Sequence, residues 1–159
     1  MNKAIAWASS VLVTCLAGCT SNPPGSAPVQ TEVCRATTEQ EIAALFDRWN
    51  QSLQTGDAHR VVDNYAPRSI LLATVSNKPR LDPAQKLDYF EHFLENKPSG
   101  RIDFRSIEIA CTTAVDAGLY TFTFAKTGAV VKARYTYTYK WDGKRWLITS
   151  HHSSALPEK

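Results

Sequence analysis

The sequence lacks several patterns that would assign a function directly. Its 159 residues hold no run of Lys or Arg, and its 18 basic residues nearly balance 15 acidic ones. Nucleic-acid binding favours a basic stripe, so no nucleic-acid partner is expected. No Gly-rich loop accompanies a strand-helix unit, so neither NAD nor a flavin is expected and no cofactor is predicted. No nucleophile elbow or Ser-His-Asp order indicates a hydrolase.

The sequence also lacks an apolar run long enough for a stable membrane span. The run from Ala4 to Ala17 follows Lys3 and fits a secretory signal. Its end, "LAGC", resembles the lipobox of bacterial lipoproteins; an ordinary signal peptide with a chance cysteine is the alternative. The resemblance implies a signal peptide over residues 1–18 and a lipid on Cys19. Thr20, in place of Asp, implies the outer membrane by the sorting rule of that class. We therefore expect an exported protein, lipid-anchored in the cell envelope and facing the periplasm.

Cysteines are few, with four in the chain. Cys15 would leave with the signal peptide and Cys19 would carry the lipid, so Cys34 and Cys111 remain. Two remaining cysteines in an exported protein predict one disulfide, with two separate buried thiols as the alternative. Neither has close partners at ligand spacing, so no metal site is expected.

Helical periodicity comes first along the chain and strand periodicity follows. Residues 19–33 are rich in Pro, Gly, Ser and Ala and predict a flexible tether before a single domain over residues 34–159. Helices before strands indicate the α+β class, with helices packed on one face of a curved antiparallel sheet. The periodicity predicts helices over 37–57, 57–66 and 82–98, and strands over 69–76, 101–111, 117–126, 130–141 and 145–154.

Several segments together resemble a known superfamily. They are "QTGD", "LLATVSN", "DYFEHFL" and "DGKRWLITSHHSSALP". Over about residues 36–157 the chain resembles the nuclear transport factor 2-like superfamily. Within it, the chain is similar to the calcium/calmodulin-dependent kinase II association domain and its stand-alone bacterial relatives, which carry polyketide-cyclase-like or enediyne-biosynthesis oxidoreductase labels. The resemblance implies a cone-shaped sheet wrapped around N-terminal helices, a pocket between them, and a homodimer or larger ring formed through the sheet.

Alternation in the last two strands gives candidate pocket residues. His151 and Ser153 share one face of the last strand, and His152 lies on the other, so one histidine points into the cone. The resemblance implies pocket arginines at positions that fall on Ser153 and near Arg134. We therefore expect Arg134, His151 and Ser153 to share a pocket in which Arg134 binds a carboxylate. The alternatives are a solvated or dimer-interface Arg134, and a one-residue register slip that exchanges the histidines.

Aromatic residues form two further sets. Tyr135, Tyr137 and Tyr139 share one strand face, which we expect to pack on a partner subunit rather than to bind a ligand. Aromatic residues of the helices and the middle strand should line the cone. The predicted ligand-binding residues among them are Trp49, Tyr65, Tyr89 and Tyr120.

The leading prediction is an exported, lipid-anchored, oligomeric domain that binds a small anionic or aromatic molecule. A small isomerase, cyclase or dehydratase is the alternative, with His151 or His152 as general acid or base. A purely structural assembly module with a filled cone is the second alternative. The expected partners are further copies of the chain, a small-molecule ligand, and the membrane through Cys19.

Overall fold

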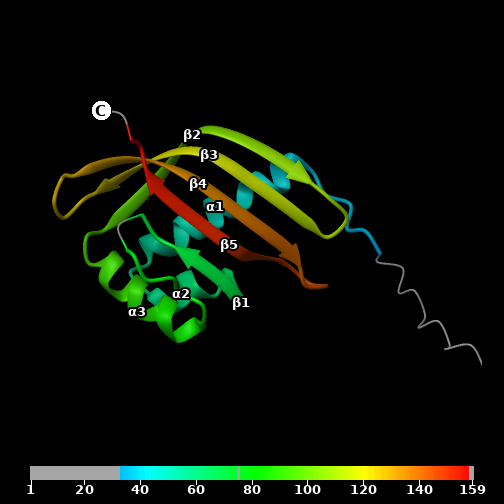
Figure 1. The fold of residues 1–159 in the computed structure, drawn as a ribbon, viewed down its shortest axis with the longest axis horizontal. Coiled ribbons are helices and arrows are strands. Elements are labelled where there is room, and N and C mark those ends of the chain that lie inside the picture. The colour runs from blue at the N-terminus through cyan, green and yellow to red at the C-terminus, as the bar shows by residue number, and fades with distance from the viewer. Residues whose placement is uncertain (1–32, 75, 158–159) are drawn as a thin grey trace, which may run out of the picture. The chain divides into compact units, whose positions relative to one another are not determined.

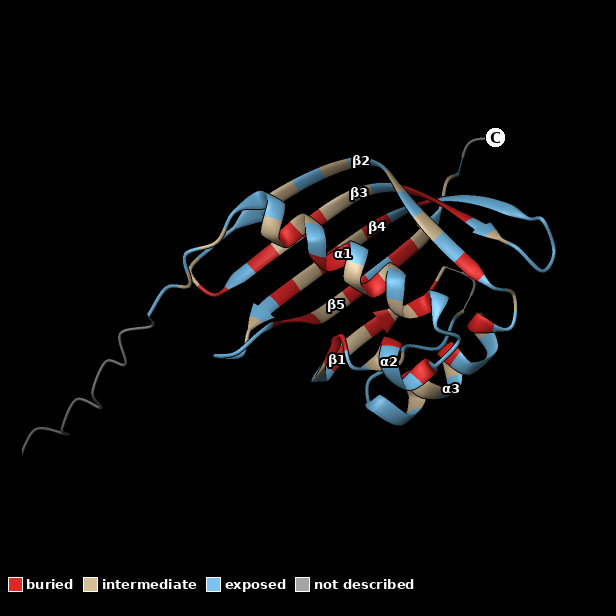
Figure 2. Cartoon of the chain, turned by 180° about the vertical axis from the view of Figure 1, so that it is seen from behind, coloured by how far each residue is buried: buried red, intermediate tan, exposed pale blue. Residues whose placement is uncertain are grey.

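Helix α1 (Glu39–Gln54) lies across the inner face of a five-stranded sheet (Figures 1 and 2). The computed structural model describes residues 33–74 and 76–157. Thr38 caps α1 by accepting a hydrogen bond from the Glu41 amide at 3.2 Å, as the sequence predicts. The apolar side chains at helical spacing then face the sheet, and Phe46 and Trp49 are almost fully buried there.

Two further helices gather at one end of the sheet. Helix α2 (Ala58–Val62) and helix α3 (Pro83–Leu94) flank strand β1 (Tyr65–Leu72) in sequence and pack on each other (Figure 1). Asp82 caps α3 by accepting from the Gln85 amide at 2.8 Å, and Pro83 takes the first helical position. The two caps place α1 and α3 where the sequence predicts them, with α3 shorter at its C-terminal end.

The sheet confirms the predicted antiparallel meander and the α+β class. Strands β2 (Pro98–Ile109), β3 (Thr113–Phe124), β4 (Val130–Trp141) and β5 (Trp146–Ala155) pair in sequence order. Strand β1 completes the order β1-β5-β4-β3-β2 and runs parallel to β5. The parallel pairing was not predicted, and β1 begins four residues earlier than the expected strand at Ser69.

A bulge in β2 bends the sheet around the helices. The register between β2 and β3 shifts between Ile102 and Phe104, which leaves Asp103 as the extra residue. Gly118 of β3 lies opposite this bend, and a Cβ atom there would approach the Phe104 carbonyl oxygen to 2.0 Å. The close approach of the two strands therefore requires glycine at this position.

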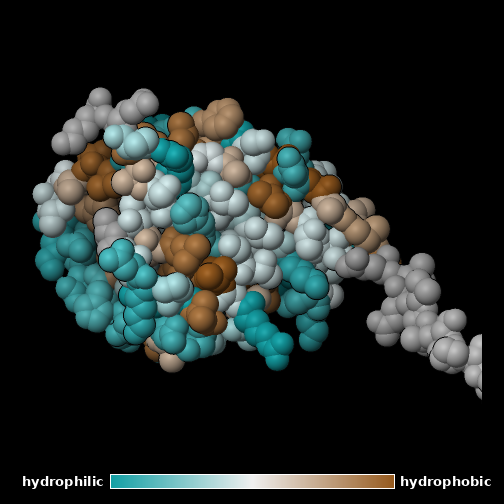
Figure 3. Space-filling view, in the orientation of Figure 1, coloured by the Kyte–Doolittle hydropathy of each residue, from teal (hydrophilic) through white to brown (hydrophobic). Residues whose placement is uncertain are grey.

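The tyrosines of β4 form part of the core of this chain. Tyr135, Tyr137 and Tyr139 are at most 2% exposed and pack beneath α1. Figure 2 shows buried bands alternating with exposed or intermediate ones along the strands. The prediction that these tyrosines pack on a partner subunit was wrong, because α1 covers their side of the sheet. The opposite side carries Thr136 and Thr138. Figure 3 shows brown apolar groups interspersed among pale and hydrophilic ones on the visible face.

The expected signal peptide over residues 1–18, including Cys15, lies outside the described residues. So do Cys19 and residues 19–32 of the expected tether. Within the described part of the chain, no helix is long and apolar enough to cross a membrane.

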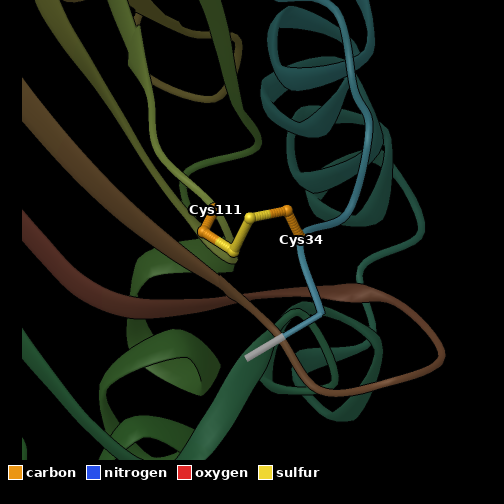
Figure 4. The surroundings of a disulfide bond; sticks show 2 residues. All are labelled: Cys34 and Cys111. Atoms are coloured by element: carbon orange, nitrogen blue, oxygen red, sulfur yellow. A yellow bond between two sulfur atoms is a disulfide. The ribbon is translucent and has the colours of Figure 1, made fainter. Parts of the chain in front are cut away.

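The predicted disulfide joins Cys34 to Cys111 (Figure 4). It connects the segment before α1 to the turn between β2 and β3, across a sequence separation of 77. The Arg35 amide also donates to the Cys111 carbonyl oxygen at 2.9 Å. Arg35 then forms an ion pair with Glu41 in the first turn of α1. The disulfide and these bonds together hold the start of α1 against the sheet.

Removing the disulfide should lower the free energy of unfolding of the full-length protein by about 4 kcal/mol, the chain-entropy expectation for a loop of this size. The variant is Cys34→Ser combined with Cys111→Ser, and urea denaturation measures the change. Wild-type protein treated with reductant should lose a similar amount. An unchanged unfolding midpoint in the double variant would show that hydrogen bonds alone hold this segment.

Candidate functional site

A cavity of about 240 Å³ lies between helices α1 and α3 and the inner face of the sheet. Its walls are largely aromatic, and its few polar side chains are those of Thr74, Asn96, His151 and Ser153, with the hydroxyls of Tyr89 and Tyr120 and the indole nitrogen of Trp49. Among the described residues that line it, none carries a formal charge at neutral pH. The aromatic lining residues are Trp49, Tyr89, Phe90, Phe93, Tyr120, Phe122 and Phe124.

His151 is the polar residue at the base of this cavity. The register pairs it with Tyr137, and its ring stacks on the Tyr137 ring at a centroid distance of 4.1 Å. The edge of Trp49 meets it at 5.4 Å. The side chain is 4% exposed. Burial, and to a lesser extent the charge of His152, lowers the pKa of His151 to about 3, so the imidazole is neutral at physiological pH.

Tyr65 is the hydrogen-bond partner of His151. The Tyr65 hydroxyl lies 2.8 Å from Nδ1 of His151, and burial raises the pKa of Tyr65 well above its usual value. We assign the hydroxyl as the donor to Nδ1, which places the ring proton of the neutral imidazole on Nε2. Nε2 is buried and has no hydrogen-bond partner in the described part of the protein. Nε1 of Trp49, another residue of the cavity lining, is likewise buried without a hydrogen-bond partner among the described residues, so two such ring nitrogens belong to the lining.

Three hydroxyl groups that line the cavity form hydrogen bonds with one another. Tyr120 donates to Oγ of Ser153 at 2.5 Å, and Ser153 forms a second hydrogen bond with Thr74. Burial raises the pKa of Tyr120, so its hydroxyl stays protonated. These hydroxyls satisfy one another, whereas Nε2 of His151 has no hydrogen-bond partner among the described residues.

The structure separates Arg134 from the other predicted pocket residues. In the antiparallel pair β4–β5, Arg134 lies opposite Ser154, whereas Tyr135 lies opposite Ser153. Residues directly opposite each other point to the same face of a sheet. Arg134 is therefore on the outer, exposed face, and the prediction that it shares a pocket with His151 and Ser153 was wrong. His152 is exposed on that outer face as well.

The other predicted residues lie at or next to the cavity. Trp49, Tyr89 and Tyr120 line it, while Tyr65 lies behind His151 and acts through that residue. Sequence reasoning missed Thr74 and Asn96. Thr74 lies within the quoted "LLATVSN" segment, but no periodicity marks a loop side chain as inward-facing.

Asp116 of β3 is a second buried polar group on the inner face of the sheet, and the sequence did not predict it. The Tyr135 hydroxyl donates to Asp116 Oδ1 at 2.8 Å, and Nε of Arg105 lies 3.1 Å from Oδ2. Burial raises the pKa of Asp116 in spite of these bonds. The only sequence signal was the alternation of Ala114 and Asp116 on one strand face, which does not distinguish inside from outside.

Comparison with known proteins gives a family and several solved structures. The family model described as "Calcium/calmodulin dependent protein kinase II association domain" matches residues 38–157. A crystal structure from Xanthomonas campestris, described as a candidate domain of that kind, has 46% identity and a TM-score of 0.73 and covers 82% of this chain and 100% of its own. No curated protein sequence matches significantly.

More distant structures show the fold alone. An NTF2-like protein of unknown function from Pseudomonas putida has 18% identity and a TM-score of 0.66, with 76% of this chain and 87% of that chain covered. A candidate aromatic ring hydroxylase from Novosphingobium aromaticivorans has 17% identity and a TM-score of 0.63, with 75% and 89% covered. Others are described as having a cystatin-like fold, in agreement with the cone expected from the sequence.

The buried neutral imidazole predicts lower stability in acid. The folded pKa of His151 is about 3 against an ordinary value of 6.5, so between these values the unfolded chain binds the extra proton. The stability contribution is complete above pH 6.5 and is lost as pH falls toward 3, by up to about 1.4 kcal/mol per pH unit. Urea unfolding of the full-length protein between about pH 7 and pH 4 measures this slope.

His151→Phe should unfold with a shallower pH dependence than the wild type, because the titrating group is gone. His152→Gln is the matched control, since it removes the exposed neighbour and should keep nearly the wild-type slope. Asp116 titrates in all three proteins, so its contribution cancels in the comparison. Equal slopes for wild type and His151→Phe would contradict a neutral, buried His151.

Proposed function

Because the chain belongs to the calcium/calmodulin dependent protein kinase II association domain family, we propose that it is a small-molecule-binding member of that family. The ligand is a neutral molecule with an aromatic or cyclic apolar body and one hydrogen-bond-accepting oxygen. The observation that carries the proposal is Nε2 of His151, which is buried in an aromatic cavity without a partner among the described residues and to which we assign the ring proton. An unsatisfied buried donor costs about 1–3 kcal/mol, which an acceptor on a ligand would recover.

The cavity supports a compact ligand. Its volume of about 240 Å³ is below the roughly 300–1,000 Å³ of sites for drug-sized molecules. The flat rings of Trp49, Phe90 and Phe93 offer faces and edges for stacking on a ring-shaped ligand. A molecule of one or two rings matches both the volume and the walls.

Charge favours the aromatic ligand over the anionic one. An anion in this cavity would lose its hydration without meeting a cation, since the arginine expected there lies on the outer face. Lys86 is buried nearby, but its ammonium donates to the Ser69 carbonyl oxygen at 2.7 Å. A neutral acceptor needs only the single donor of His151.

The low pKa of His151 favours ligand binding over acid-base catalysis. A general base works best when its pKa lies near the operating pH, and the pKa of His151 is about 3. The cavity lining includes no carboxylate among the described residues that could share the proton transfer. His151 is therefore proposed as a hydrogen-bond donor that orients the ligand.

We also propose that the protein is exported, anchored by lipid on Cys19, and assembled through the outer side of its sheet. The "LAGC" sequence and the disulfide between Cys34 and Cys111 support export. The family supports self-association. Exposed apolar side chains on the outer side of β2, β3 and β4 offer a surface for it; they include Phe104, Leu119 and Val130.

Three probes of similar size test the ligand proposal: acetophenone, ethylbenzene and benzoate. Acetophenone should bind the full-length protein about fivefold more tightly than ethylbenzene, because one hydrogen bond is worth about 0.5–1.5 kcal/mol. Benzoate should bind most weakly, because it must be desolvated without a cation. Chemical-shift titration measures the affinities, and native mass spectrometry reports the oligomer and any retained ligand.

His151→Phe should abolish the preference for acetophenone over ethylbenzene while it keeps an aromatic ring at the site. His152→Gln, with its change on the outer face, should retain the preference. Preferential binding of benzoate, or no binding of any probe, would contradict the proposed ligand class. Thermal unfolding of each variant confirms that it is folded before titration.

Two cysteine variants, Cys19→Ser and its control Cys15→Ser, test the proposed lipidation. Cys19→Ser should move the protein from the membrane fraction to the soluble fraction and remove the acyl mass from the intact protein. Cys15→Ser should leave both properties unchanged, because that residue leaves with the signal peptide. Intact-mass spectrometry of full-length protein produced in a Gram-negative bacterium measures the modification. Identical behaviour of the two variants would contradict anchoring through Cys19.

A further inference from the structure

A second cleft, of about 360 Å³, lies outside the aromatic cavity and shares no lining residue with it. It is formed by α1, by α2 with the turn that follows it, and by the turn that leads into β5. Figure 2 shows α2 beside β1 on the helix side of the molecule. The cleft lining is polar and rich in arginine: Arg48, Ser52, Arg60, Asp63, Asn64 and Arg145.

Arg48 is held in a fixed position in this cleft. Its Nε donates to Oδ1 of Asn64 at 2.9 Å, and its Nη2 donates to the Trp146 carbonyl oxygen at 2.8 Å. The Asn64 side chain is in turn fixed by its own bonds to the carbonyl oxygens of Arg60 and Val61. These bonds orient the guanidinium and leave the Nη1 group for a ligand, so no ordering of a long side chain is required on binding.

Positive charge in the cleft exceeds negative charge. Three arginines against Asp63 leave a net charge of +2 on the lining residues. The nearest acidic partner of Arg60 is Asp57 at 3.8 Å, a weak and exposed pair. Asp63 forms no ion pair within 4.0 Å among the described residues. Burial lowers the pKa of Arg48; the interaction with Tyr139 opposes this shift, and the positive charge of Arg145 adds to it.

We propose that this cleft binds a phosphoryl group, with Arg48 as the fixed donor and Arg60 and Arg145 closing on the anion from the solvent side. A phosphate monoester carries about −1.5 to −2 charges at neutral pH, which matches the net charge of the lining. Its three terminal oxygens accept from several guanidinium forks, whereas a carboxylate has two oxygens and one charge. The group belongs either to a soluble phosphate ester or to a lipid headgroup.

Inorganic phosphate and glycerol phosphate test the site on the full-length protein, by calorimetric titration at constant ionic strength. Wild-type protein should bind both saturably. Arg60→Gln combined with Arg145→Gln should weaken binding by at least about tenfold, because two charge-assisted contacts are lost. Both side chains are exposed, so the fold should be unaffected. Arg68→Gln combined with Arg134→Gln removes the same charge from exposed positions outside the cleft and should bind like the wild type.

Vesicles of phosphatidylcholine with and without phosphatidic acid separate the two sources of the phosphoryl group. Binding to phosphatidic acid vesicles that inorganic phosphate displaces, and that the cleft double variant loses, assigns the site to a lipid headgroup. Binding of the soluble phosphates without binding to the vesicles assigns it to a soluble ester. The proposal is overturned if neither soluble phosphate binds, or if the cleft and control double variants weaken binding equally.

Discussion

The hydrogen bond between Tyr65 and His151 joins the first strand of the chain to the last, and the properties of the cavity depend on it. Parallel pairing of β1 with β5 brings the two side chains together, with Leu71 in register with His151. The bond satisfies Nδ1 and, with the Tyr65 hydroxyl assigned as its donor, places the proton on Nε2. Without Tyr65, either ring nitrogen could carry the proton and the cavity would have no defined donor. Tyr65 is thus a positioning residue, and His151 is the residue that meets a ligand.

The curved sheet and the aromatic core explain why this donor stays unsatisfied. The bulge at Asp103 and the close approach at Gly118 bend β2 and β3 around α1, so the sheet encloses space rather than lying flat on the helix. Phe and Tyr side chains occupy most of that space. Their rings are too stiff to fill all of it, and they supply few polar atoms. The remaining volume is largely apolar, so the few polar groups at its edge, among them Nε2 of His151 and Nε1 of Trp49, determine its chemistry.

Local signals in the sequence predict the elements well. Thr38 and Asp82 locate two helix starts, and alternation locates four strands of the meander, because both signals depend on neighbouring residues only. Alternation also shows that His151 and His152 face opposite ways. It does not show which face is inside, because that depends on where α1 lies. The tyrosines of β4 were assigned to the wrong side for this reason.

The sequence does not determine which residues lie opposite each other in neighbouring strands. Arg134 is one residue away from the register that would bring it into line with Ser153, and one residue reverses the face of a side chain. The partners of Asp116 come from β2 and β4, and those of Arg48 come from residues 16 and 98 positions away. No periodicity within one segment carries such information. The family resemblance supplied the fold, but its pocket arginines did not transfer to this chain.

The disulfide also determines how the domain responds to tension. If the chain is anchored on its N-terminal side, a pull enters at Val33 and reaches the covalent link at Cys34 immediately. The load then passes to Cys111 and into the β2–β3 turn, and the segment between the two cysteines is bypassed. Helices α1 and α3, with strand β1, all lie within that bypassed segment. Much of the cavity wall is therefore mechanically isolated from a load applied at Val33, and such a load would not be transmitted along those helices.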